Sequence, residues 1–177
     1  LIERLEEEAQ KEYPEKLRYV LRDLAAKEGA FAYEYTGYLA NIHSVQSYYQ
    51  ANIDMLESKK FYSLFSPNQK IYTKVKNEEP TYYANTSKVS TSQFASGSII
   101  EGEVVQSVLS RNIYVHKDSV VKDSILFPRV VIGQGAQVEY AILDKGVEVA
   151  DGVVIRGTAE HPVVVKKGET VTEDIYS

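Results

Sequence analysis

Residues 102–155 read, in consecutive blocks of 17, GEVVQSVLSRNIYVHKD (102–118), SVVKDSILFPRVVIGQG (119–135), AQVEYAILDKGVEVADG (136–152) and VVI (153–155). Five columns of apolar residues recur at this interval. They are Val104, Val121, Val138 and Ile155; Val108, Ile125 and Ile142; Leu109, Leu126 and Leu143; Ile113, Val130 and Val147; and Val115, Ile132 and Val149. Five columns that stay in register over three periods indicate a structural repeat.

Each period divides into three shorter units, because aliphatic residues recur about every five or six positions within it. This spacing is typical of hexapeptide repeats, which wind into a parallel β-helix with three short strands per coil. One coil cannot bury its inward aliphatic side chains alone, so each is covered only by the neighbouring coils. We therefore predict a mostly β fold with a β-helix of about three to four coils. Leu126 is expected to lie buried in an inward column.

Composition excludes several classes of protein. The net charge of −5 is shared by both halves of the chain and forms no nucleic-acid footprint. The absence of cysteine excludes disulfides and thiolate metal sites, and it fits a reducing compartment. No apolar run approaches the length of a membrane span, and the first residues do not form a signal peptide. We therefore expect a cytoplasmic protein that binds neither nucleic acid nor a membrane.

The residues before the repeat have an α/β pattern. A helix is predicted over residues 15–27, because Leu17, Val20, Leu21 and Leu24 share one face and Gly29 would end it. Residues 30–35 alternate like a strand, although they have no evident sheet to join. A second helix, capped by Ser44, is expected to run through Leu56. Residues 1–57 are therefore expected to be the end of an α/β domain. Its aromatic side chains would be partly exposed without the rest of that domain, namely Phe31, Tyr33, Tyr48 and Tyr49.

Two boundaries follow from where the pattern stops. Residues 58–83 are expected to be a connection with one strand, from Ile71 to Val75. The β-helix domain then covers residues 84–177, and its first coil is expected to be short, with a spacing of 14 residues instead of 17. The columns fail after Ile155, so we expect the β-helix to end there and a tail to follow. The tail has a strand pattern over residues 163–165 and a turn at residues 167–168.

Few residues could carry chemistry. His116 lies at a coil corner, where hexapeptide acyltransferases use a histidine as general base, although a surface histidine is the simpler interpretation. His161 precedes a proline in the tail and has no evident partner. No phosphate-binding glycine loop appears, and no cluster of histidine and carboxylate residues has metal-ligand spacing. The sequence thus predicts no catalytic, cofactor-binding or metal-binding residue.

Basic residues lie at outward positions of the repeat. Arg111, Arg129 and Lys145 could contact an anionic effector, although solvated edges of a solenoid often carry such charges.

Two segments resemble a known enzyme family. GYLANIHSV (37–45), followed by YQANIDML (49–56), resembles the end of the nucleotidyltransferase domain of glucose-1-phosphate adenylyltransferases. That family has an aromatic-rich Tyr-Trp-x-Asp-Val-Gly-Thr followed by Tyr-x-x-Ala-Asn-Met-Asp-Leu-Leu. IEG (100–102) and QSVLSR (106–111) are similar to the opening of its β-helix. The resemblance covers roughly residues 15–160, and it implies left-handed coiling.

The departures from that family point to a regulatory chain. Catalytic members hold a divalent metal with the aspartate of Asp-Val-Gly, and this sequence has Asn41 there. His43 replaces the glycine of the same motif. The two residues therefore resemble a vestigial sugar-nucleotide site, and the changes resemble the regulatory, GlgD-type subunit. The resemblance implies a homo- or hetero-oligomer with a catalytic subunit, which would supply the Mg²⁺ site.

Three functions remain open at this point. The chain is expected to be the C-terminal part of a regulatory, non-catalytic subunit that supports oligomerisation and allosteric control of ADP-glucose synthesis in glycogen biosynthesis. Alternatively it is the C-terminal part of an active adenylyltransferase, because the family's glycine-rich loop would lie upstream of these residues. A hexapeptide-repeat acyltransferase is the third possibility.

Overall fold

The computed structural model describes residues 2–31, 33–66, 71–73 and 77–177. The chain divides into two compact units, Leu1–Thr36 and Gly37–Ser177. The first unit contains helices α1 (Ile2–Ala9) and α2 (Leu17–Glu28). Helix α2 matches the predicted helix and ends at Gly29, whose φ of 76° suits glycine. Of its predicted apolar face, Val20 is buried, whereas Leu17 and Leu21 are exposed.

The strand predicted over residues 30–35 is wrong. The described residues of this segment form no strand, and Phe31 and Tyr33 are 105% and 89% exposed. A strand needs a neighbour for its backbone groups, and no other described segment pairs with this one. Alternating aromatic residues were therefore insufficient to form a strand.

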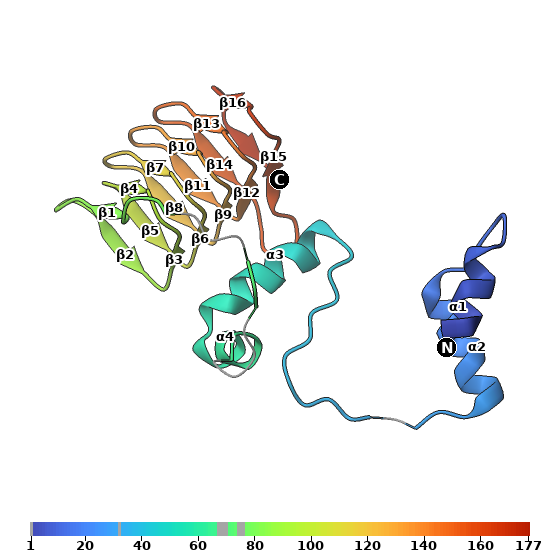
Figure 1. The fold of residues 1–177 in the computed structure, drawn as a ribbon. Coiled ribbons are helices and arrows are strands. Elements are labelled where there is room, and N and C mark those ends of the chain that lie inside the picture. The colour runs from blue at the N-terminus through green and yellow to red at the C-terminus, as the bar shows by residue number, and fades with distance from the viewer. Residues whose placement is uncertain (1, 32, 67–70, 74–76) are drawn as a thin grey trace. The chain divides into compact units, whose positions relative to one another are not determined.

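The second unit is built around a solenoid of 17 short strands in three parallel sheets, as the stacked arrows of Figure 1 show. Sheet A contains β1 (Tyr82–Tyr83), β4 (Ile99–Ile100), β7 (Tyr114–Val115), β10 (Val131–Ile132), β13 (Glu148–Val149) and β16 (Thr170–Val171). Sheet B contains β2 (Lys88–Ser90), β5 (Glu103–Val105), β8 (Val120–Lys122), β11 (Gln137–Glu139), β14 (Val154–Arg156) and β17 (Ile175–Tyr176). Sheet C contains β3 (Gln93–Phe94), β6 (Val108–Leu109), β9 (Ile125–Leu126), β12 (Ala141–Leu143) and β15 (Val163–Val165).

The predicted columns form the core of this solenoid. Val121 pairs in register with Val104 and Val138, and Leu126 pairs with Leu109 and Leu143. Leu126 is fully buried, as predicted. Each inward side chain removes apolar surface from water worth about 1.5–3 kcal/mol, and this burial is complete only when the next coil is present. The 17-residue repeat therefore sets both the strand register and the core.

The corners of the coils repeat with the same period. Gln106, Asp123 and Tyr140 occupy one corner with φ values of 47°, 45° and 50°. Such left-handed conformations are unfavourable for residues other than glycine, so the stacked coils must hold them. At another corner, the left-handed conformation is adopted by two glycines, Gly135 and Gly152.

Buried serines link successive coils at one corner. The Ser107 hydroxyl donates to the Val105 carbonyl at 2.7 Å and accepts from the Ser124 N–H at 3.1 Å. The Ser124 hydroxyl donates to the Lys122 carbonyl at 2.6 Å and accepts from the Ala141 N–H at 3.1 Å. Both serines are fully buried. This ladder explains why small polar residues recur at this column.

The solenoid is longer than predicted, with about six turns instead of three to four. In its first coil, Phe94 pairs with Leu109 and Ile100 pairs with Val115, so the spacing is 15 residues and not 14. The expectation that the β-helix ends at Ile155 is also wrong, because β15 pairs with β12 and β16 pairs with β13. The predicted strand at residues 163–165 and turn at residues 167–168 are present, as parts of a further coil. Val163 pairs with Ala141 at a spacing of 22 residues, because a loop over residues 158–162 inserts five residues.

Helices precede the solenoid in the second unit. They are α3 (Val45–Ile53), the 3₁₀ turn η1 (Asp54–Leu56) and α4 (Ser58–Leu64). Ser44 caps α3 as predicted, and its side chain accepts from the Ser47 N–H at 3.1 Å. Helix α4 lies where only a connection was expected. Residues 71–73 are not in a strand, and the rest of the strand predicted from Ile71 to Val75 lies outside the described residues. None of the described helices is long and apolar enough to cross a membrane.

Candidate functional site

Helix α3 is packed on the outer face of sheet C. Tyr49 is 2% exposed and forms a cluster with Ile125 and Ile142, which point outward from β9 and β12. The Tyr49 hydroxyl donates to the Asp123 carbonyl at 2.7 Å. The Tyr48 ring stacks on Phe127, with centroids 6.5 Å apart. Partial exposure was predicted for both tyrosines; it holds for Tyr48, whereas Tyr49 is buried by the solenoid.

Burial has an electrostatic consequence at Tyr49. Removing its phenol from water raises its pKa, and the nearby Asp123 and Tyr140 raise it further. The neutral phenol can then serve as a donor to the Asp123 carbonyl at ordinary pH. This contact fixes α3 to the corner of the solenoid that follows β8.

Asn41 and His43 lie in the segment that enters α3. Both residues are exposed, and His43 Nδ1 is 3.0 Å from the Asn41 carbonyl oxygen. The His43 N–H donates to the Ser47 hydroxyl at 2.9 Å, which ties this segment to the helix cap. The two residues predicted to form a vestigial site are thus close together, and solvent reaches both side chains.

The residues around Asn41 do not fit a divalent metal. Hard cations such as Mg²⁺ are held by carboxylates, and an amide oxygen contributes no negative charge. Among the described residues, no group of three or more histidine or acidic side chains is placed to hold a metal ion.

A polar cluster that the sequence analysis missed holds this entry segment in place. The Tyr38 hydroxyl donates to Asp54 Oδ2 at 3.0 Å, while Gln50 and Lys60 contact Asp54 Oδ1 at 3.0 and 2.9 Å. Burial acts to raise the pKa of Asp54, but the hydrogen bonds from Lys60, Gln50 and Tyr38 outweigh it and lower the pKa. Asp54 therefore ties the chain before Asn41 to helices α3 and α4. The sequence signal for this cluster was Asp54 itself, the aspartate of the YQANIDML motif. The sequence analysis used that motif only to support the family resemblance.

A mainly apolar hollow lies beside the start of α3. Its volume is about 480 Å³. It is lined by Ser44, Val45, Tyr48, Phe127, Ile142, Asp144, Lys145 and Val164. One of the three predicted effector contacts, Lys145, is therefore at its rim, while Asn41 and His43 do not line it.

The other predicted effector contacts lie on the same corner of the solenoid. Arg111, Arg129 and Lys145 precede β7, β10 and β13 of sheet A in successive coils. The Arg129 N–H donates to the Arg111 carbonyl at 3.0 Å, which shows that these coils are adjacent. Arg111 Nε is 3.5 Å from Glu78 Oε2, whereas Arg129 and Lys145 are exposed. Lys167 precedes β16 at the same corner and was missed, because its coil was expected to be a tail.

The two remaining histidines, His116 and His161, have different surroundings. The His116 ring stacks on Tyr114 with centroids 3.8 Å apart, and its Nδ1 is 4.0 Å from Glu101 Oε2. His161 belongs to the inserted loop, where its N–H donates to the Thr158 hydroxyl and its carbonyl accepts from Ser177.

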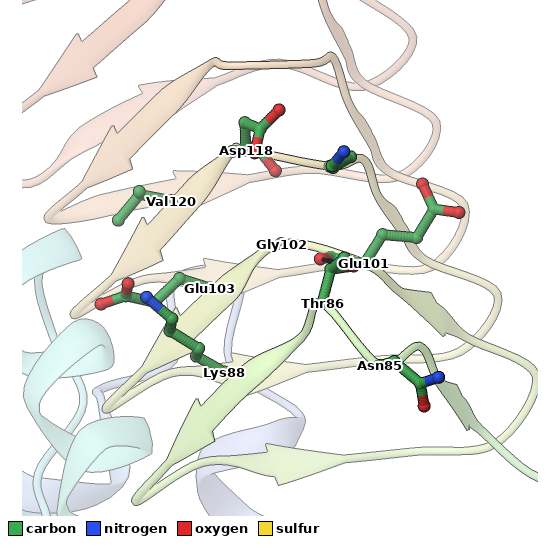
Figure 2. A pocket seen from close by; sticks show the side chains of 10 residues that line it. Asn85, Thr86, Lys88, Glu101, Gly102, Glu103, Asp118 and Val120 are labelled. Atoms are coloured by element: carbon green, nitrogen blue, oxygen red, sulfur yellow. Dashed lines mark hydrogen bonds between the residues drawn. The ribbon is translucent and has the colours of Figure 1, made fainter.

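A second, polar hollow lies at the corner between sheets A and B, with a volume of about 510 Å³. Figure 2 shows Asn85, Thr86 and Glu101 at this corner, with Lys88 and Glu103 on the neighbouring strands β2 and β5. Carboxylates and lysines are mixed around it, because Lys117 and Asp118 also line it. This mixture does not favour one class of ligand.

Comparison with known proteins gives several relatives. Over 153 residues the chain is 40% identical to the glycogen biosynthesis protein GlgD of Bacillus subtilis, covering 77% of this chain and 40% of that protein. It is 35% identical to glucose-1-phosphate adenylyltransferase of Bacillus cytotoxicus over 140 residues, covering 79% and 37%. The enzyme of the same name from Bacillus mycoides is 33% identical over 125 residues, covering 71% and 33%. The chain thus spans well under half the length of these relatives.

A family model describes the repeat region itself. The model of the GlmU-like, C-terminal hexapeptide matches residues 74–173, which include most strands of the three sheets. The match reaches into the sixth coil, in agreement with the strand pairing. On this evidence, the chain belongs to the GlmU-like C-terminal hexapeptide family.

Proposed function

We propose that this chain is the C-terminal part of a regulatory, non-catalytic subunit of glucose-1-phosphate adenylyltransferase, acting in glycogen biosynthesis. The similarity to GlgD supports the process, and the similarity to the adenylyltransferases supports the relation to that enzyme. The proposed partner is a catalytic subunit, which would hold the Mg²⁺ and carry out ADP-glucose synthesis.

The observation that carries the regulatory assignment is Asn41. A neutral amide stands where the catalytic pattern has its metal-binding aspartate, and the side chain is exposed with no acidic cluster beside it among the described residues. Transferring a nucleotidyl group requires a cation that neutralises developing phosphate charge. A chain that lacks the carboxylate is poorly suited to hold that cation, whereas it can still contribute a binding surface.

The packing of α3 on sheet C supports a mechanical role for the solenoid. Tyr49 and Asp54 connect the segment around Asn41 to the solenoid and to α4. An effector held by Arg111, Arg129 and Lys145 would contact coils that also carry this helix, because Lys145 lines the hollow beside α3. Binding there could change the position of α3 and so affect a partner; such coupling is reciprocal between the two sites.

The test uses the full-length protein that contains this chain. ADP-glucose formation from ATP and glucose 1-phosphate is measured with the protein alone, and then with an equimolar catalytic subunit. The expected result is little or no activity alone, together with a changed rate or effector response of the partner. Asn41→Asp is the matched variant, and it is expected to leave the effect on the partner intact. Robust turnover by the isolated protein without any effect on the partner would refute the proposal and favour an active adenylyltransferase.

A further inference from the structure

The chain contains one Asp-Gly sequence, at Asp151 and Gly152, and no Asn-Gly sequence. An aspartate before glycine is chemically labile in an unfolded chain, because glycine has no side chain that hinders attack by its backbone nitrogen on the aspartate side chain. The two residues lie in the turn between β13 and β14, and both are exposed to water. Sequence and exposure therefore favour modification at this bond, so the local geometry determines whether the bond reacts.

The reaction is a rearrangement of the backbone. The Gly152 nitrogen forms a bond to Cγ of the protonated Asp151 carboxyl, and one carboxyl oxygen leaves as water with its own proton and the amide proton. The product is a five-membered succinimide ring, which water then opens. Addition of water at Cγ restores aspartate, whereas addition at the backbone carbonyl carbon gives isoaspartate. The water lost in the first step is regained in the second, so no other reactant is needed.

Both reacting groups are held by one residue of the preceding coil, Gln134. The Gln134 N–H donates to Asp151 Oδ1 at 2.7 Å, and the Gly152 N–H donates to the Gln134 carbonyl at 2.9 Å. Ring closure requires the Asp151 carboxyl to leave the first hydrogen bond and the Gly152 nitrogen to give up the proton of the second. The folded coil therefore holds the electrophile and the nucleophile in an unreactive arrangement.

Gly133 makes room for this contact. It is buried, and a Cβ atom at this position would lie 2.6 Å from Asp151 Oδ1 and 2.7 Å from the Asp151 nitrogen. The corner itself does not require glycine here, because Gly133 has no positive φ and the equivalent residues of the neighbouring coils are His116 and Ala150. The close approach of Asp151 therefore explains the glycine.

An aspartate elsewhere in the solenoid makes the same contact without the labile sequence. Asp174 Oδ1 accepts the Val154 N–H of the preceding coil at 2.8 Å. The next residue is Ile175, whose β-branched side chain hinders attack by its nitrogen. Such contacts therefore join coils in both places, and Gly152 is what gives the contact of Asp151 a chemical consequence.

We propose that the bond between Asp151 and Gly152 is a latent isoaspartate site, which the two hydrogen bonds to Gln134 keep closed in the folded coil. Local opening of this turn starts the reaction. In the product, the main chain passes through Cβ and Cγ of Asp151 and gains one atom between β13 and β14. Val149 and Ile155 pair in register with the neighbouring coils on either side of this turn, so a chain that has reacted loses the spacing that this pairing requires.

The first test compares the whole folded chain with a synthetic peptide of residues 146–156, which is also the peptide that trypsin releases by cleavage after Lys145 and Arg156. Both are incubated in the same mildly acidic buffer, and the chain is digested only afterwards. Isoaspartate is measured by chromatographic separation of the isomers and by labelling with an isoaspartyl methyltransferase. The reaction should be at least about tenfold slower in the folded chain, because the clamped turn opens only transiently. Equal rates would overturn the proposal.

The second test removes one of the two hydrogen bonds. Residues 133–136 form a type II turn, in which Gly135 has a positive φ and the Ala136 N–H donates to the Gly133 carbonyl. Proline is common at the second residue of this turn, so Gln134→Pro should keep the coil folded while deleting the N–H that holds Asp151. The reaction in the folded variant should become about three- to tenfold faster than in the wild-type chain.

Lys117→Pro is the matched control. Lys117 has the same place in the turn of the coil before, and its N–H has no hydrogen-bond partner among the described residues. This variant should react at the wild-type rate, and circular dichroism would verify that both variants are folded. An unchanged rate in folded Gln134→Pro, or an equal acceleration in Lys117→Pro, would overturn the proposal. If Gln134→Pro does not fold, hydrogen exchange of the Gly152 amide in the wild-type chain replaces it, and exchange as fast as in the peptide would overturn the proposal.

Discussion

In the solenoid, each inward side chain meets a similar one in the next coil, whereas Phe31 and Tyr33 remain almost fully exposed. Both segments have apolar side chains at strand-like spacing. The difference lies in strand pairing. Each strand of the solenoid pairs with another strand 15 to 22 residues away in the sequence, whereas residues 30–35 pair with no described strand. Short strands are thus made stable by their neighbours, and spacing alone does not define them.

The largest expected effect comes from breaking a core column. Leu126→Asp places an uncompensated charge in a fully buried position, which should cost more than about 4 kcal/mol and unfold the solenoid. Val164→Asp is the control, because Val164 lies two strands away in the same sheet C but is 50% exposed. Thermal denaturation followed by circular dichroism distinguishes them. An unchanged melting temperature for Leu126→Asp would show that the column assignment is wrong.

A smaller effect is expected from the serine ladder. Ser124→Ala removes the acceptor for the Ala141 N–H and leaves that buried group unpaired, which should cost about 1–3 kcal/mol. Ser90→Ala, on the exposed side of β2, should change stability little. Urea denaturation measures both. Equal effects of the two substitutions would contradict a specific role for the ladder.

The next prediction removes one hydrogen bond between α3 and the solenoid. Tyr49→Phe keeps the ring but removes the hydrogen bond to the Asp123 carbonyl, so a loss of about 1 kcal/mol is expected. Tyr62→Phe, at an exposed position of α4, is the matched control.

The same substitution should change the pH dependence of stability. Because burial raises the pKa of Tyr49 above that of the unfolded chain, its contribution is fully present below about pH 10 and is lost as the pH rises further. Tyr49→Phe should therefore flatten the decline in the free energy of unfolding above that pH. Urea titrations on both sides of the transition measure this, and an identical decline in both proteins would exclude Tyr49 as its source.

The smallest effect is expected where no packing is present. Phe31→Ser should change the free energy of unfolding of the solenoid by less than about 0.5 kcal/mol, since the side chain is fully exposed. Denaturation of the second unit, followed through solenoid amide signals in NMR, provides the measurement. A loss comparable to that of Tyr49→Phe would indicate packing that the structure does not contain.

Much of the solenoid could be predicted from its period, because stacking turns a repeated aliphatic residue into a core column. The sixth coil was missed, since the five inserted residues at 158–162 displaced Val163 and Val171 from the 17-residue register. A search for the same inward pattern at a longer spacing would have found it. The burial of Tyr49 depends on which faces meet, and a linear pattern does not contain that information. Asn41 and His43 could be singled out only through the family resemblance.

Hydrogen exchange tests the central claim most directly, namely that stacking on a neighbouring coil determines which segments are ordered as strands. The amides of Val163, Val165 and Val171 should be protected, because these N–H groups face the coil with which their strands pair. The amides of residues 30, 31 and 33–35 should exchange rapidly in the same sample. Rapid exchange at Val163 and Val165, or protection at residues 30, 31 and 33–35 equal to that of Leu126, would contradict the account.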